Sequence, residues 1–221
     1  MDHPVTTNTG GNDFLTRVYN CKNNDDLVTL YDDWAESYSN DVTDATQNYV
    51  APALAAQAVV QAGGNVHNGT TFDAGCGTGL SGIALHHVGA KTIDGLDLSP
   101  GMLRIARRTG VYRDLRTGDL SQLLVGTGDE EYDVVFCVGT WTHGHVGPKP
   151  SLAEFVRVVR PGGIVAGTVL DDIWSSHGFE AEVERLRREG AVEVVSADSM
   201  DYRKGAGVMA KVLVLRKKVN V

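Results

Sequence analysis

Residues Thr70–Gly82 read TTFDAGCGTGLSG, and the fold expected of this chain follows from them. A short β-favouring run ends in Asp73, and a helix-compatible run, 80–88, comes after the glycines. Three glycines alternate with other residues between these runs: Gly75, Gly77 and Gly79. Glycine has no Cβ, so it turns at positive φ and lets a ligand lie against bare backbone. Strand, glycine turn and helix in this order predict an open α/β sheet with a ligand at the carboxyl end of the strand.

Two registers of these glycines predict different ligands. The segment 77–82 satisfies GxGxxG, the dinucleotide fingerprint, although a bare match of this kind has low specificity. The other register starts at Asp73 and places a carboxylate ahead of the alternate glycines. A carboxylate repels a pyrophosphate but attracts an ammonium group. S-adenosylmethionine, which has an amino-acid head, a ribose and no phosphate, fits this second register.

In that register DAGCGTG, at 73–79, resembles the first motif of class I S-adenosylmethionine-dependent methyltransferases. The resemblance covers nearly the whole chain after about Leu27. The segment YDDWAESYSNDV, at 31–42, is most similar to the methyltransferase-like family named after the Williams–Beuren syndrome region. In that family the aromatic residues fold over the cofactor as part of a lid, which implies this role for Tyr31, Trp34 and Tyr38. For Trp34, simple packing of an amphipathic helix on the core is an equally open interpretation.

Composition and charge limit the class of protein. The 221 residues suffice for one domain with an added cap. A net charge of −8 and a pI near 5.3 argue against a general nucleic-acid or membrane surface. The polar residues 1–12 show no secretory signal, and no run has the length of a membrane span. Three widely spaced cysteines without a CxxC pair indicate a reducing compartment and no structural zinc. We therefore expect a cytoplasmic enzyme with no nucleic-acid or membrane partner, and the oligomeric state stays open.

The order of elements predicts a tail, a cap and a core. We expect a disordered tail over 1–12, a helical cap over 13–66 that serves as the lid, and a core over 67–221. Helices are expected at 14–21, 25–38, 49–62, 80–88, 101–108, 152–159 and 178–189. Strands are expected at 70–73, 91–98, 111–117, 132–139, 164–170, 192–197 and 208–216. The resemblance implies an α/β, Rossmann-like sheet of seven strands in the order 3-2-1-4-5-7-6. Its last strand is antiparallel, and a turn-rich link joins it to the strand before it.

Acidic residues at the ends of the expected strands are candidates for cofactor contacts. Asp97 lies 18 residues past Gly79, the spacing at which an acid accepts hydrogen bonds from both ribose hydroxyls. Asp119 follows the third strand, and the resemblance implies that it binds the adenine amino group. The predicted cofactor residues are Tyr31, Trp34, Tyr38, Asp73, Gly75, Cys76, Gly77, Asp97, Leu98, Met102, Asp119, Leu120 and Cys137.

Two histidines directly after the fourth expected strand face the cleft where an acceptor would bind. His143 is the candidate general base or acceptor-orienting residue, since an imidazole titrates near neutral pH. A histidine that merely bonds the loop backbone is an equally open interpretation. His145, Trp141 and Asp171 are predicted to contact the acceptor. A metal site made of the two histidines with Asp171 or Asp172 is disfavoured, because the loop lacks the carboxylates that hard cations prefer. We expect no metal.

These observations together predict an S-adenosylmethionine-dependent methyltransferase that transfers a methyl group in line to a small-molecule acceptor. The absence of an insertion large enough to recognise a protein or an RNA favours a small acceptor by elimination. One alternative is a protein that binds the cofactor without methyl transfer, such as a repurposed lyase or cyclase, or a partner subunit. The other is an NAD-dependent oxidoreductase, which Asp73 and the terminal hairpin disfavour. The acceptor and the methylated atom stay open.

Overall fold

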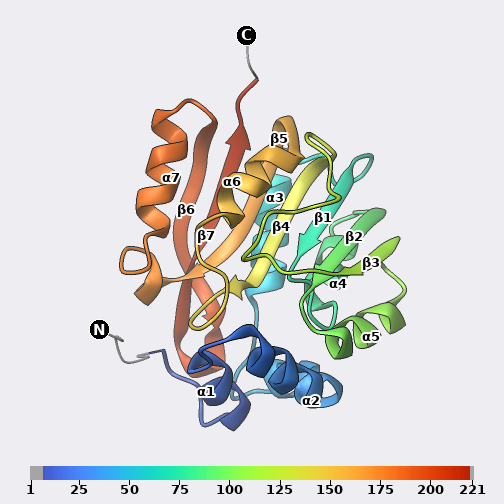
Figure 1. Ribbon diagram of the computed structural model, residues 1–221, viewed down its shortest axis with the longest axis vertical. Helices are drawn as coiled ribbons and strands as arrows, with labels where there is room; N and C mark the ends of the chain where they lie inside the picture. Colours follow the sequence, from blue (N-terminus) through green and yellow to red (C-terminus); the bar gives the residue numbers. More distant parts are fainter. Residues whose placement is uncertain (1–6, 220–221) are drawn as a thin grey trace.

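The computed structural model describes residues 7–219, and these residues form a seven-stranded sheet in the order β3-β2-β1-β4-β5-β7-β6. The neighbouring pairs from β3 to β5 are parallel, whereas β7 is antiparallel to both β5 and β6. The predicted Rossmann-like order and the predicted antiparallel strand are therefore confirmed. Figure 1 shows helix α6 in front of the sheet and helix α3 behind it, the layered arrangement of an α/β fold.

The elements have the following bounds. The strands are β1 (Thr70–Ala74), β2 (Thr92–Asp97), β3 (Asp114–Thr117), β4 (Tyr132–Trp141), β5 (Val159–Leu170), β6 (Val192–Arg203) and β7 (Val208–Lys217). The helices are α1 (Asp13–Tyr19), α2 (Asn24–Thr43), α3 (Ala51–Gln61), α4 (Leu80–His87), α5 (Pro100–Thr109), α6 (Ser151–Val158) and α7 (Phe179–Arg188). Two 3₁₀ turns, η1 (Asp171–Ile173) and η2 (Lys204–Ala206), follow β5 and β6.

The middle of the sheet is buried because its strands are apolar on both faces. Val134, Val135 and Phe136 of β4 have no exposed surface, and Ile164 of β5 has none either. Such continuous apolar strands are typical of parallel sheets covered by helices on both faces. The rigid centre of the sheet thus fixes where the loops after β1, β2 and β4 begin.

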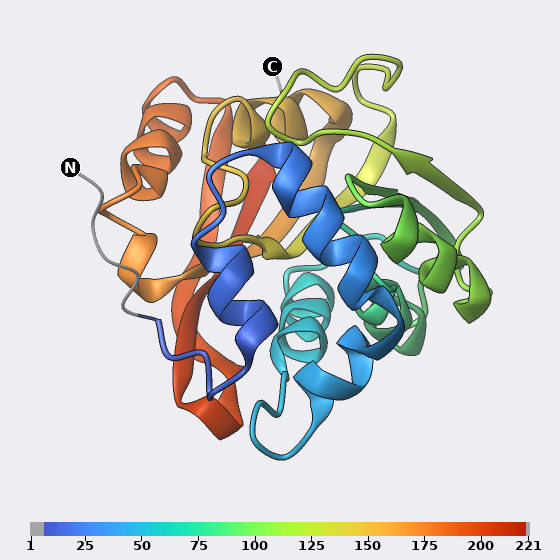
Figure 2. The same ribbon diagram turned by 60° about the horizontal axis from the view of Figure 1, so that its bottom comes forward.

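Helices α1 and α2 lie across the carboxyl end of the parallel strands, as Figure 2 shows. Asp32 of α2 anchors this cap: its Oδ1 accepts hydrogen bonds from Ser99 Oγ at 2.5 Å and from the Gly101 amide at 2.7 Å. These donors belong to the start of α5, so Asp32 satisfies the Gly101 amide, which the helix leaves unpaired, and holds the hydroxyl of the N-cap residue Ser99. Glu36, one turn further along α2, forms a salt bridge with Arg108. Helix α2 is therefore fixed on α5 above the strand ends.

The structure differs from the prediction in the C-terminal hairpin and in the N-terminal segment. Strand β6 extends to Arg203, where a turn-rich link was expected, because pairing with β7 continues past the predicted end. Residues 1–6 of the predicted disordered tail lie outside the described residues. Over 7–12 the structure instead shows specific contacts: Asn8 donates to the Ala206 carbonyl and its own carbonyl accepts from Arg203.

Candidate functional site

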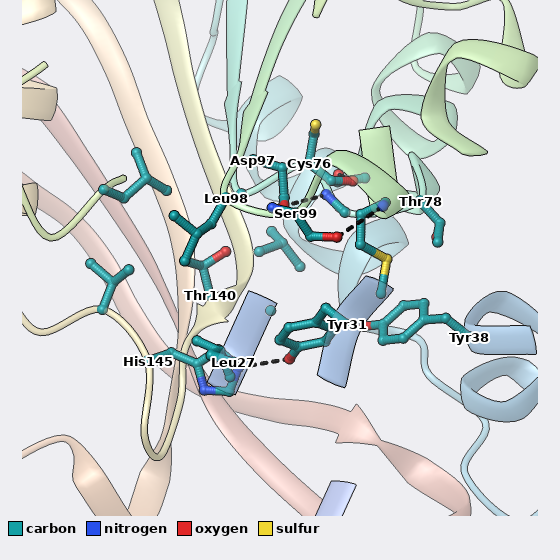
Figure 3. Close-up of a pocket in the computed structure, with 18 of the residues that line it drawn as sticks. Leu27, Tyr31, Tyr38, Cys76, Thr78, Asp97, Leu98, Ser99, Thr140 and His145 are labelled. Carbon is teal, nitrogen blue, oxygen red and sulfur yellow. Dashed lines mark hydrogen bonds between the residues drawn. The ribbon is translucent and has the colours of Figure 1, made fainter. Parts of the chain in front are cut away.

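A cavity lies where the carboxyl ends of β1, β2, β3 and β4 meet helix α2. The space that its lining bounds, including open solvent at the mouth, is about 910 Å³. Figure 3 shows its walls: loop residues that follow β1 and β2 on one side, and α2 with the loop after β4 on the other. The topological position is the one at which open α/β sheets bind their ligands.

Eleven of the residues predicted to contact cofactor or acceptor line this cavity. They come from α2, from the end of β2, from the start of α5 and from the loops after β1, β2, β3 and β4: Tyr31, Tyr38, Gly75, Cys76, Gly77, Asp97, Leu98, Met102, Asp119, Leu120 and His145. The sequence analysis missed other lining residues, among them Asn24, Tyr49, Ser121, Thr140 and Val146. Thr140 was accessible to prediction, since it directly follows an expected strand. Ser121 lies in a loop, Asn24 is the first residue of α2 and Tyr49 precedes α3, and none of them carries such a signal.

The glycine loop after β1 forms the floor of the cavity. Gly75 has φ +79°, and a Cβ there would stand 1.9 Å from Thr140 Oγ1. Gly77 has φ +52°, but a Cβ there would meet nothing within 4 Å. Gly75 is thus required both for the turn and for the close approach of Thr140 near the end of β4, whereas Gly77 is required only for the turn.

Asp97, the last residue of β2, is held in place by two backbone amides. Its Oδ2 accepts from the Gly77 amide at 2.8 Å and its Oδ1 from the Ser99 amide at 2.9 Å. Burial raises the pKa of Asp97, while these two amides act in the opposite direction. Each carboxylate oxygen retains a lone pair for a further donor. Asp97 is therefore a positioned acceptor for the hydroxyl groups of a ligand in the cavity.

Asp119 connects the end of β3 to the cap. Its Oδ1 accepts from the Ser121 amide and hydroxyl at 2.8 and 2.6 Å, and its Oδ2 accepts from Asn24 Nδ2 at 2.9 Å. Asn24 opens helix α2, so the bond closes one edge of the cavity. A ligand that bonds the Asp119 carboxylate must share its oxygens with these donors.

Tyr31 of α2 and His145 of the loop after β4 are hydrogen-bonded to each other in one wall of the cavity (Figure 3). Tyr31 Oη lies 2.6 Å from His145 Nε2. Burial lowers the pKa of His145 to about 4, so the ring is neutral near pH 7. Burial also raises the pKa of Tyr31 well above its usual range, so the phenol keeps its proton. The wall therefore presents a neutral, hydrogen-bonded pair instead of charged groups.

Asp73 lies behind the glycine loop and outside the cavity lining. Its Oδ2 accepts hydrogen bonds from Ser81 Oγ and Tyr112 OH, each at 2.7 Å, and the side chain is fully buried. Burial raises the pKa of Asp73 to about 7. Side chains alternate along a strand, so the residue that ends a strand can point into the core instead of beyond it. In this structure Asp73 fastens the loop to α4 and to the segment before β3.

Three further predicted residues are core residues. Trp34 is fully buried, donates from Nε1 to Asp41 Oδ2 at 2.7 Å and stacks on Phe14 with ring centroids 5.1 Å apart. This arrangement is the packing interpretation that the sequence left open. Trp141 and Cys137 of β4 also have no exposed surface, and for Cys137 the predicted cofactor contact was with the backbone. Their side chains point into the layers beside the sheet and lie outside the cavity lining.

His143 and Asp171 also lie outside the cavity lining. His143 Nε2 is 2.9 Å from Asp172 Oδ2 and 3.1 Å from Thr7 Oγ1, in a polar cluster on the far side of the loop. Asp171 is exposed and accepts from Ser199. Gly144, with φ +71°, turns the chain between the two histidines, so that His145 alone enters the cavity. Within 7–219, no group of three or more His, Cys, Asp or Glu residues is arranged to hold a metal ion.

Comparison with known proteins identifies the family. The model of the family described as methyltransferase domain matches residues 72–167. Methyltransferase-like protein 27 of Homo sapiens is 35% identical over 182 residues, which cover 80% of this chain and 73% of that protein. The chain belongs to the class I S-adenosylmethionine-dependent methyltransferases. Across the curated relatives that it matches, this methyltransferase spans about a third to three quarters of their length.

Two solved structures share the fold of this methyltransferase at low sequence identity. One is an S-adenosylmethionine-dependent methyltransferase of Thermotoga maritima, a possible histamine N-methyltransferase. It has a TM-score of 0.59 and 18% identity over 87% of this chain and 99% of that chain. The other is the [4+2]-cyclase SpnF, with a TM-score of 0.59 and 19% identity over 76% of this chain and 81% of that chain. At these identities the likeness concerns the fold.

The methyltransferase binds S-adenosylmethionine, and the residues of the cavity fit that cofactor. Its ribose hydroxyls need an acceptor, and Asp97 offers two positioned oxygens. Its amino-acid head needs open backbone, which Gly75 and Gly77 provide. When bound, the cofactor supplies an electrophilic methyl group. Among the described residues that line the cavity there is no Lys or Arg, which also matches a ligand without phosphate.

Proposed function

We propose that this methyltransferase transfers the methyl group to a small-molecule acceptor held beside Tyr49, Thr140, His145 and Val146. The observation that carries the proposal is the cavity beneath the cap. The loop residues that would hold the cofactor and the four residues named above line this same cavity. Helix α2 is bonded to α5 and to the end of β3, so it covers the cavity as a fixed roof. A compact acceptor fits beneath that roof more readily than a folded macromolecule.

In this proposal Asp97 holds the ribose, the glycine loop holds the amino-acid portion, and Asp119 with Leu120 holds the adenine. Tyr31 and Tyr38 form the wall nearest the transferred methyl. The enzyme mainly aligns donor and acceptor, and such alignment can lower a barrier by about 7–11 kcal/mol. Asp73 acts by fastening the loop instead of contacting the cofactor.

We also propose a cytoplasmic location. Its three cysteines are free thiols, which suits a reducing compartment. None of the helices within 7–219 is long and apolar enough to cross a membrane.

Formation of S-adenosylhomocysteine tests the function. The purified protein is incubated with S-adenosylmethionine and, in separate reactions, a small-molecule library, total RNA and a denatured protein extract. We expect product only with members of the library, and the variant Asp97→Asn should give less product at limiting cofactor. Product only with RNA or protein would contradict the small acceptor. Tight cofactor binding without product in any reaction would favour a cofactor-binding role without methyl transfer, as in a cyclase.

A further inference from the structure

The hydrogen bond between Tyr31 and His145 has a direction that the surrounding atoms determine. His145 Nδ1 lies 2.5 Å from the His143 carbonyl oxygen and 3.1 Å from Thr142 Oγ1. A carbonyl oxygen can only accept, so a nitrogen this close to it carries the proton. Because the ring is neutral near pH 7, Nε2 has no proton. His145 is therefore held in the Nδ1–H tautomer.

The orientation of the Tyr31 hydroxyl follows from that tautomer. Nε2 is an acceptor, so the Tyr31 hydroxyl, 2.6 Å away, donates its single proton to it. Both side chains line the cavity, one from α2 and the other from the loop after β4 (Figure 3). Tyr31 Oη therefore presents lone pairs, and no proton, to a molecule bound in the cavity.

Resting on the methyl transfer proposed above, we propose that Tyr31 and His145 form a proton relay that selects an acceptor whose methylated atom bears a hydrogen. The acceptor class is a neutral hydroxyl or amine, whose O–H or N–H donates to Tyr31 Oη. Tyr31 is then a catalytic residue that contacts the acceptor, and His145 is the proton carrier behind it. The His143 carbonyl is a positioning group, because it acts by fixing the tautomer.

The proton balance is simple. As the acceptor atom gains the methyl group, the sulfonium S–CH3 bond breaks and its electron pair stays on sulfur. The O–H or N–H bond of the acceptor breaks, and the proton passes to Tyr31 Oη. The original Tyr31 O–H bond breaks at the same time, and that proton forms an N–H bond at His145 Nε2. The tyrosine ends the step as a neutral phenol. The imidazolium of His145 then returns its proton to solvent, which restores the starting tautomer.

The surroundings of His145 suit transient protonation. Within 7–219 no carboxylate lies within ion-pair distance of its ring, whereas His143 Nε2 is bonded to Asp172. The rings that face His145 are Tyr31 and Tyr19, both neutral. A carboxylate partner would stabilise the imidazolium and retain the proton. Without one, His145 releases the proton readily, so the pair works as a relay and His143 does not.

The same geometry disfavours an anionic acceptor. A carboxylate placed against Tyr31 Oη would meet lone pairs. Turning the hydroxyl toward the anion would break the bond to His145 Nε2 and leave that buried nitrogen unsatisfied. Such an unsatisfied group weakens binding by about ten- to hundredfold. Discrimination by a missing hydrogen bond is the kind of selection that polar cavities achieve.

Nitrogen-15 NMR of the side chain tests the tautomer without any acceptor. We expect a protonated Nδ1 and an unprotonated, hydrogen-bonded Nε2 for His145 near pH 7. In Tyr31→Phe the Nε2 resonance should shift toward that of a nitrogen without a donor. The control is Tyr38→Phe, which removes a hydroxyl from the same helix and cavity and should leave the His145 resonances unchanged. A proton on Nε2, or a charged ring near pH 7, would overturn the proposal.

A matched acceptor series then tests the selection. Naphthol, naphthylamine and naphthoate share one ring system and differ in the methylated group. We expect S-adenosylhomocysteine with the first two at rates at least tenfold above naphthoate. Tyr31→Phe should lower kcat about 10²–10⁴-fold with little change in KM or in affinity for S-adenosylhomocysteine. Naphthoate turnover equal to that of naphthol, or unchanged kcat in Tyr31→Phe, would overturn the relay.

The two proposals fail in distinguishable ways. If the protein binds the cofactor but forms no product with any acceptor, methyl transfer fails and the proton transfer fails with it, whatever the NMR shows. If product forms but Tyr31→Phe turns over normally, methyl transfer stands and the relay is wrong.

Discussion

Replacing Asp73 by asparagine is expected to change the free energy of unfolding by an amount that depends on pH. The carboxyl group is fully buried, and among the residues at 7–219 none donates to its Oδ1. Burial raises its pKa from 3.8 to about 7. The folded protein therefore binds this proton more tightly than the unfolded chain does. By linkage, the stability contributed by Asp73 falls as the pH rises from about 4 to about 7.

The magnitude follows from the two pKa values. They differ by about 3 units, each worth about 1.4 kcal/mol, so the ionised carboxylate costs about 4 kcal/mol above pH 7. Asparagine keeps one oxygen for the hydroxyls of Ser81 and Tyr112. Its amide nitrogen takes the unpartnered position, which costs about 1–3 kcal/mol. We expect Asp73→Asn to be about 1–3 kcal/mol more stable than the wild type near pH 8, and between equally stable and about 2 kcal/mol less stable near pH 5.

Urea denaturation of both proteins at the two pH values measures this difference. The difference in unfolding free energy between variant and wild type should grow by about 3 kcal/mol from about pH 5 to about pH 8. Asp171→Asn, on the surface, removes one charge without burial and serves as the control. A difference for Asp73→Asn that does not change with pH would refute the reasoning, because it would mean that the carboxyl titrates normally.

Three further substitutions test the site and its support. Gly75→Ala should weaken cofactor binding in calorimetry far more than Gly77→Ala, because its Cβ would meet Thr140 while the other Cβ meets nothing within 4 Å. Gly77→Ala should lose only about 1–2 kcal/mol of binding free energy, because alanine is strained at this positive φ. Equal losses of cofactor affinity in the two variants would contradict the close approach of Thr140 to Gly75. Trp34→Ala should lower the unfolding free energy by about 3–5 kcal/mol in urea, and intact stability with lost cofactor affinity would place the ring in the site instead. Asp97→Asn should weaken S-adenosylhomocysteine binding by about ten- to hundredfold, and unchanged affinity would remove it from the ribose site.

Much of the fold was predictable because it follows from local rules. The alternate glycines after Asp73 stand between a β-favouring run and a helix-compatible run. This pattern predicted a strand, a turn and a helix, and the structure has all three there. The continuous apolar run at 134–138 predicted a strand buried on both faces, and the structure has β4 there. The end of β6 was missed because Asp198 and Ser199 disfavour strands locally, and pairing with β7 overrides that preference.

The candidate site was predictable to the level of loops but not of side-chain direction. Residues at strand ends such as Asp97 and Asp119 line the cavity, since the carboxyl ends of parallel strands converge at one edge. Asp73 was predicted to contact the cofactor, whereas in the structure its carboxylate accepts from Ser81 and Tyr112 behind the glycine loop. No periodicity applies in the loop after β4, so nothing in the sequence distinguished His143 from His145.

The sequence by itself determined the strands, the helices and the glycine turn, because backbone propensities and residue spacing act over short distances along the chain. The strand order and the cofactor class were implied by the resemblance of its motifs to a known family. Only the tertiary structure decided which groups face the cavity. Trp34 packs on Phe14, and Gly144 turns the chain so that His145 reaches Tyr31 of a helix more than a hundred residues earlier. Contacts of that kind depend on how distant segments pack, and no local pattern encodes them.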